Sequence, residues 1–233
     1  MGLLFHLKVE NQPNPAAIAF QFSTVSFIML YLYHLLVFCW TITHFGWENM
    51  DDMAGSQWDM RVVRALSPPV QKPHEHKDLY FSLFYTTVHV FSLVSALVFW
   101  AVLVPTGHGS LNSLDGVVIW GKLVAPFSSG WLQSFCVINL YGVTVLLVLL
   151  EILLLNSIKC PVSLVFFSGL YLCWAALGER VTGRSPYFFL DSEAMGGTGH
   201  AIAASAGFIS LAPTVLSVIY GLTALREGWT SGA

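Results

Sequence analysis

Five apolar runs constrain the fold of this chain more than any motif in it. An α-helix rises ~1.5 Å per residue, so ~20 residues are enough to cross a hydrocarbon core of ~30 Å. Each run meets or approaches that length. We therefore predict an all-α, polytopic membrane helix bundle with about five transmembrane helices. The runs are Ile18 to Ile42, Phe81 to Val104, Trp131 to Leu155, Pro161 to Leu177 and Ala201 to Leu225.

The composition supports a membrane protein. Apolar residues make up 55% of the chain and charged residues only 10%, against roughly 25% charged residues in soluble proteins. The net charge of -3 is small and scattered over the loops. It provides no basic surface for nucleic acid, so we expect no nucleic-acid partner. We treat residues 1–233 as one transmembrane domain that contains a polar loop at 43–80.

The polar loop contains one pattern that resembles a metal site. His74 and His76 flank Glu75 directly after Pro73. Zinc sites use such ligands, but they need at least one more from elsewhere in the chain, and none stands out. We interpret this pattern as a solvated segment, and we expect neither a metal nor a cofactor.

Three ionisable residues lie inside the apolar runs, where a charge costs a few kcal/mol: His34, His89 and Glu151. Counted from the ends of the first two antiparallel runs, the histidines fall at similar depth, and Glu151 falls in the same half of the membrane. His89 also shares a helical stripe with small and polar residues, which predicts that its ring points inward; these residues are Ser82, Thr86, Ser92 and Ala96. Two readings remain open. The three residues form a structural polar cluster, or the histidines are the axial ligands of a haem.

A second group of polar residues is predicted nearer the other face. Thr24 of the first run and Tyr141 of the third differ by only ~6 Å in depth, so their side chains could line one cavity. From the residues alone, hydrogen bonding between helices explains them better than catalysis. A hydroxyl needs a base to become a nucleophile, and the third run contains no histidine.

Several segments resemble the androgen-induced membrane protein family, whose relatives include the rolling stone protein and a set of plant multipass proteins. The similarity covers most of the chain, from about residue 19 to 225. The matching segments are Phe22-Ser-Thr24, Val98-Phe-Trp100, Asn139-Leu-Tyr141, Leu149-Leu-Glu151-Ile-Leu-Leu-Leu-Asn156, Leu170-Tyr-Leu-Cys-Trp174, Arg180-Val-Thr-Gly183 and Pro186-Tyr-Phe-Phe-Leu-Asp191.

The resemblance implies an intramembrane threonine hydrolase that cleaves esters of fatty acids with hydroxy fatty acids. It places the threonine at Thr24 and the histidine base at the position that holds Tyr141 here. A tyrosine with a pKa of ~10 is a poor base near neutral pH. We therefore expect a non-catalytic or degenerate member, acting as a lipid-binding protein or as a subunit of a membrane assembly.

Two alternatives remain. The first is a fatty-acid ester hydrolase that uses Thr24, and the second is a haem or quinone electron carrier. The expected partners are membrane lipids, a fatty-acyl ligand or other membrane protein subunits. The resemblance implies a eukaryotic multipass protein of the endomembrane system or plasma membrane, with another organelle membrane as the alternative.

Overall fold

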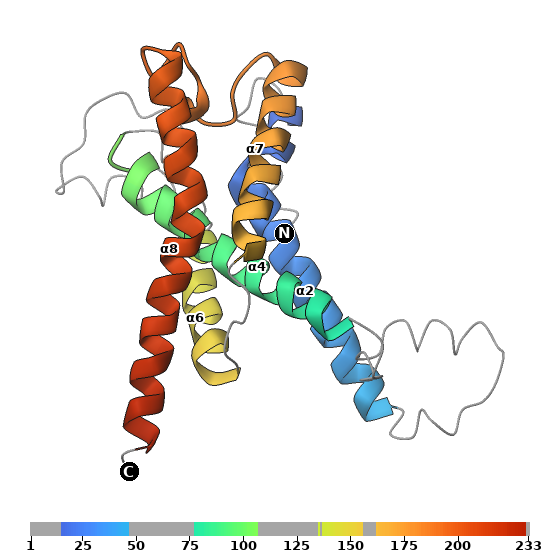
Figure 1. Ribbon diagram of the computed structural model, residues 1–233. Helices are drawn as coiled ribbons and strands as arrows, with labels where there is room; N and C mark the ends of the chain where they lie inside the picture. The colour runs from blue at the N-terminus through green and yellow to red at the C-terminus, as the bar shows by residue number, and fades with distance from the viewer. Residues whose placement is uncertain (1–14, 47–76, 107–134, 136, 156–161, 232–233) are drawn as a thin grey trace.

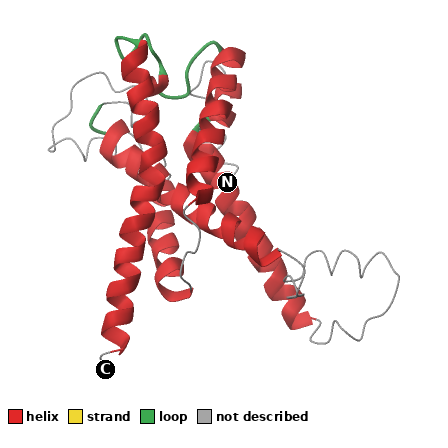
Figure 2. Ribbon diagram, in the orientation of Figure 1, coloured by secondary structure: helices red, strands yellow, loops and turns green. Residues whose placement is uncertain are grey.

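The computed structural model describes residues 15–46, 77–106, 135, 137–155 and 162–231, and all regular structure in these ranges is helical (Figures 1 and 2). This confirms the predicted all-α membrane bundle. The α-helices are α2 (Phe22–Gly46), α4 (Lys77–Leu97), α6 (Thr144–Leu155), α7 (Val162–Thr182) and α8 (Thr198–Ser231). The described residues also form two short 3₁₀ helices, η1 (Pro15–Phe20) and η7 (Phe188–Leu190). They form two π-helical segments as well, η3 (Val98–Leu103) and η6 (Asn139–Val143).

Four of the five predicted spans are long and apolar enough to cross a membrane. These are Phe22–Thr43, Leu79–Leu103, Ser163–Thr182 and Thr198–Gly228. The described part of the third run gives a shorter apolar helix, Asn139–Leu153. Residues 131–134 and 136 of that run lie outside the described residues, as do residues 47–76 of the polar loop.

Four helices extend beyond the runs that predicted them. α2 continues past Ile42 to Gly46, and α4 begins at Lys77, before Phe81. α7 continues past Leu177 through Glu179 and Arg180, and α8 has 34 residues. Hydropathy marks the part of a helix that lipid surrounds, whereas charged residues with good helix propensity prolong the helix beyond it. α7 then ends before Gly183, whose φ of 72° is the left-handed conformation that commonly terminates a helix.

α4 is the central helix of the bundle. It crosses the molecule obliquely and contacts α2, α6, α7 and α8 (Figure 1). Its apolar window is 67% buried, whereas the windows of the other three spans are 17–28% buried. The stripe that the sequence predicts to face inward is buried over most of its length. Its members Thr86, His89, Ser92 and Ala96 are buried, and Ser82 at its start is half-buried. Small and polar side chains allow neighbouring helices to approach closely on every side.

Phe22 lies where α2, α4, α7 and α8 meet. Its ring centroid is 5.0 Å from Phe91 of α4, 4.8 Å from Tyr171 of α7 and 5.0 Å from Phe208 of α8. The contacts are tilted or edge-on, the arrangements that aromatic pairs prefer. Phe22 is only 1% exposed, so one side chain joins four helices.

η1, which directly precedes α2, packs against α7 and is hydrogen-bonded to it. The Trp174 indole donates a hydrogen bond to the Ala19 carbonyl at 3.1 Å, and the Tyr171 hydroxyl donates to the Phe20 carbonyl at 3.0 Å. The Phe20 ring lies 4.9 Å from that of Trp174 and covers Gly178. These contacts set where the chain enters α2.

Gly178→Ala is expected to destabilise the bundle by about 1–3 kcal/mol, the usual cost of overpacking. A Cβ atom at this position would lie 2.6 Å from the Cβ atom of Phe20, so η1 has to shift away from α7. The free energy of unfolding in detergent measures the effect. Gly169→Ala on the same helix is the matched control, because its Cβ atom meets nothing within 4 Å. There the helix propensity of alanine should stabilise by up to about 1 kcal/mol. Equal effects at both positions would contradict the prediction.

Candidate functional site

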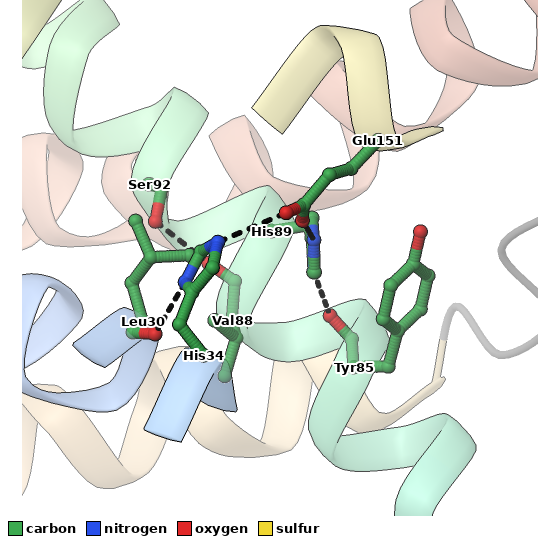
Figure 3. A network of polar contacts seen from close by, with 7 residues as sticks. All are labelled: Leu30, His34, Tyr85, Val88, His89, Ser92 and Glu151. Atoms are coloured by element: carbon green, nitrogen blue, oxygen red, sulfur yellow. Dashed lines mark hydrogen bonds and ion pairs between the residues drawn. The ribbon is translucent and has the colours of Figure 1, made fainter. Parts of the chain in front are cut away.

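The structure brings His34, His89 and Glu151 together as one polar cluster (Figure 3). The Glu151 carboxylate lies between the two histidines, with Oε1 2.9 Å from His34 Nε2 and Oε2 2.6 Å from His89 Nε2. Each ring also contacts the backbone of its own helix. His34 Nδ1 is 2.9 Å from the Leu30 carbonyl oxygen, and His89 Nδ1 is 2.8 Å from that of Tyr85. The cluster therefore joins α2, α4 and α6, as the sequence predicted.

The cluster lies midway along α2, and its three side chains differ in exposure. His34 is twelve residues from each end of α2, which is ~18 Å along the helix. The side chain of His89 is 0% exposed, that of Glu151 22% and that of His34 44%. Tyr33 packs edge-on against both imidazoles, at 5.2 Å from His34 and 4.8 Å from His89. The His89 ring is thus enclosed by protein, whereas part of the His34 ring is exposed at the outer surface of the bundle.

The haem hypothesis gains no support from this geometry. A bis-histidine haem needs the two ligating nitrogens to face each other across a porphyrin. Here both Nε2 atoms are directed at the Glu151 carboxylate instead. In the part of the chain that the structure describes, no three histidine, cysteine, aspartate or glutamate side chains are arranged to hold a metal ion.

A second group, the hydroxyl cluster of Ser23, Tyr141 and Tyr187, lies nearer the start of α2. The Ser23 side chain is the hydrogen-bond partner of the Tyr141 hydroxyl. The Ser23 backbone N–H donates to the Tyr187 hydroxyl at 3.3 Å. The sequence predicts that Tyr141 pairs with Thr24 instead. Thr24 directly follows Ser23 on α2, and it is half-buried. The hydroxyl of α2 that contacts Tyr141 is that of Ser23.

A small polar cavity adjoins the hydroxyl cluster. Its volume of about 10 Å³ is room for about one water molecule. A fatty-acyl chain does not fit into this space. The lining residues come from α2, α4, η6 and α6 and are Ser23, Ser26, Phe27, Ser92, Ser95, Leu140 and Thr144. Thr24 and Tyr141, the two side chains that the sequence predicts to line one cavity, are not among the residues that line this one.

Sequence reasoning missed the two π-helical segments, of which η6 lines this cavity through Leu140. They contact each other through Trp100, whose indole donates to the Tyr141 carbonyl at 3.0 Å. The rings of Phe99 and Tyr141 stack with centroids 3.8 Å apart and planes inclined by 2°. A π-helical turn carries one extra residue and often occurs at a functional site. The hydrophobic pattern of the sequence does not predict a π-helical turn.

No family model, curated protein or solved structure matches this chain. The likeness to the androgen-induced membrane protein family rests on the sequence segments quoted above. The function has to be argued from the two clusters and from the outer surface of the bundle.

Proposed function

We propose that this chain is a non-catalytic relative of lipid-ester hydrolases that acts in the membrane as a lipid-binding protein or as a subunit of a membrane assembly. The observation that carries the proposal is the state of Tyr141. Its ring is stacked on Phe99, and its hydroxyl is bonded to Ser23. At the position where the resemblance requires a base, the chain has a phenol held in place by packing.

The deep histidines are poorly placed to replace that base. His34 is ten residues beyond Thr24 on α2, which corresponds to ~15 Å along the helix axis. His89 bonds to the same glutamate as His34, so it lies at the same level. A general base has to come within about 3 Å of the proton that it removes, or reach it through one water molecule. The two nitrogens that could accept that proton are already directed at Glu151.

The outer surface of the bundle supports a role based on contact with lipid or other membrane proteins. The windows of α2, α7 and α8 are 17%, 28% and 22% buried, so large apolar faces of three helices point outward. These faces carry bulky side chains such as Phe38 at 61% exposed and Phe166 at 66% exposed. Surfaces of this kind fit acyl chains or apolar helices. The sequence resemblance favours the endomembrane system or the plasma membrane.

The alternative is an intramembrane ester hydrolase that uses Thr24. One observation favours it, namely the polar cavity beside Ser23, which has room for the one water molecule that hydrolysis consumes. Thr24 would attack the ester carbonyl and release the alcohol, and water would then release the fatty acid. This route still requires a group to accept the threonine proton.

The test is hydrolysis of a fatty-acid ester of a hydroxy fatty acid by the purified full chain in lipid nanodiscs. We expect no turnover above background for the native chain, and weak turnover for Tyr141→His, because imidazole is a suitable base near neutral pH. Combining Tyr141→His with Thr24→Ala should abolish that turnover. Combining it with Ser23→Ala is the matched control, which shows whether the neighbouring hydroxyl is the nucleophile instead.

Each outcome decides between the two functions. Turnover by the native chain that Thr24→Ala abolishes would overturn the proposal and establish the hydrolase. Absence of turnover in the native chain and gain in Tyr141→His would support a degenerate site. If the gain disappears with Ser23→Ala and not with Thr24→Ala, the assignment of Thr24 is wrong.

A further inference from the structure

The hydrogen bonds of the polar cluster determine how many protons it holds. A carbonyl oxygen only accepts hydrogen bonds. Because His34 Nδ1 contacts the Leu30 carbonyl and His89 Nδ1 contacts the Tyr85 carbonyl, both Nδ1 atoms carry a hydrogen. These two protons belong to the backbone contacts and are unavailable to the carboxylate.

The two contacts to Glu151 need two further protons. Each lies between a ring nitrogen, Nε2, and a carboxylate oxygen, at 2.9 Å for His34 and 2.6 Å for His89. Without a proton in between, each would be a repulsive contact of two lone pairs. Either both rings are imidazolium beside an ionised carboxylate, or one ring is imidazolium and the carboxyl is protonated. Both arrangements contain four protons and carry a net charge of +1.

The same three side chains hold fewer protons when they stand apart in water. Near pH 7.5 each imidazole carries one proton and the carboxylate none, which gives two protons and a net charge of -1. The geometry of the polar cluster therefore corresponds to two protons more than the separated groups hold. A net charge is costly at this depth in a membrane, so a state with three protons and no net charge competes with it.

We propose that the polar cluster is a proton-binding site that joins α2 to α6 when it holds four protons and releases His34 from Glu151 when it holds three. Three protons satisfy only three of the four contacts. A neutral His34 with its hydrogen on Nε2 would keep Glu151 and lose the Leu30 carbonyl, so the proposal requires that both Nδ1 atoms keep their hydrogens and that one contact to the carboxylate is lost. The contact that remains is the one of His89, which is shorter and whose side chain is 0% exposed. His34 has a longer contact and a side chain that is 44% exposed, so it is the one that leaves.

The other ionisable groups around the cluster are compatible with this assignment. Tyr33 of α2 and Tyr85 of α4 face the rings, and both are neutral phenols near neutral pH. α8 contributes Arg226, which donates to the Leu153 carbonyl at the end of α6 and also pairs with Glu227 at 3.6 Å. On α7, the Tyr171 hydroxyl donates to the Phe20 carbonyl at the end of η1, fourteen residues before His34.

The first measurement is nitrogen-15 magnetic resonance of histidine-labelled full chain in lipid bilayers between pH 5.5 and pH 8.5. The His34 signals are identified by their loss in His34→Gln. At the acidic end we expect His34 as an imidazolium, or as a neutral ring with hydrogen on Nδ1 whose Nε2 accepts a hydrogen bond from the Glu151 carboxyl. At the basic end His34 should be a neutral ring with hydrogen on Nδ1 and an Nε2 that accepts no hydrogen bond, which the nitrogen-15 shift of Nε2 reports. An Nε2-only tautomer of His34, or two neutral rings at pH 5.5, would overturn the proposal.

The second measurement is the melting temperature of the same preparations over the same pH range. The His34 contact stabilises the bundle while the fourth proton is bound, so the native chain should lose stability as pH rises. In His34→Gln the amide donates to Glu151 at every pH. The part of the pH dependence of the melting temperature that comes from the His34 contact should therefore vanish. His200→Gln is the matched control, since His200 is an exposed histidine outside the cluster, and it should behave as the native chain does. If the melting temperature of His34→Gln depends on pH as that of the native chain does, the proposed release of His34 from Glu151 is refuted.

Discussion

Replacing Phe22 with alanine should lower the free energy of unfolding by about 3–5 kcal/mol. The cavity term alone, at ~24 cal/mol per Å³ for the roughly 100 Å³ that the ring fills, amounts to about 2–2.5 kcal/mol. Three aromatic contacts are lost as well, each worth about 0.5–1.5 kcal/mol. Their partners, Phe91, Tyr171 and Phe208, belong to three different helices, so the hole cannot close by moving one element.

The free energy of unfolding in mixed micelles, titrated with a denaturing detergent, measures this effect. Phe38→Ala on the same helix is the control, because Phe38 is 61% exposed on the outer face and its removal leaves no cavity. We expect a change below about 0.5 kcal/mol there. A loss of similar size at both positions would show that Phe22 is not the junction of the four helices.

The polar cluster yields the second large effect. Glu151→Ala and His89→Ala should each cost roughly 1–3 kcal/mol, because each leaves a polar partner without its hydrogen bond. His89 has no access to water that could replace the carboxylate, since its side chain is 0% exposed. The double variant should lose less than the sum, with a coupling energy of about 0.5–3 kcal/mol.

A full double-mutant cycle on the free energy of unfolding measures this coupling. Pairing Glu151→Ala with Phe38→Ala gives the reference cycle, since Phe38 is not part of the polar cluster. That pair should be additive within about 0.5 kcal/mol. Additive effects of His89→Ala and Glu151→Ala would mean that the 2.6 Å contact contributes nothing to stability.

The helices could be predicted from the sequence because lipid imposes a strong and simple pattern. Apolar runs of about 20 residues located α2, α4, α7 and α8, and the stripe through His89 identified the buried face of α4. The helix ends were less accurate. α8 begins at Thr198 and ends at Ser231, beyond both ends of its apolar run, because backbone hydrogen bonding continues where the lipid ends.

The polar cluster was predictable for the same reason. Ionisable side chains are rare in apolar runs, and counting residues from the ends of antiparallel helices placed all three in the same half of the membrane. The hydroxyl cluster was harder. Serine and threonine are common in such helices, and one residue changes the direction of a side chain by about 100°. Depth alone therefore could not separate Ser23 from Thr24. The two π-helical segments each add one residue to a turn, which again changes the direction of the side chains that follow. No residue pattern in the sequence predicts these segments.

The length of α8 has a consequence for the bilayer around it. Its apolar run, Ala201 to Leu225, has 25 residues, which at ~1.5 Å per residue extends about 37 Å. A hydrocarbon core of ~30 Å is thinner than this. A tilt of roughly 35° brings the rise of the run along the bilayer normal down to about 30 Å, which is near the upper end of the tilts that transmembrane helices adopt. We therefore expect α8 to cross the membrane at a steep tilt, with Arg226 and Glu227 near the headgroups. A thicker bilayer requires less tilt, so α8 favours thick membranes over thin ones.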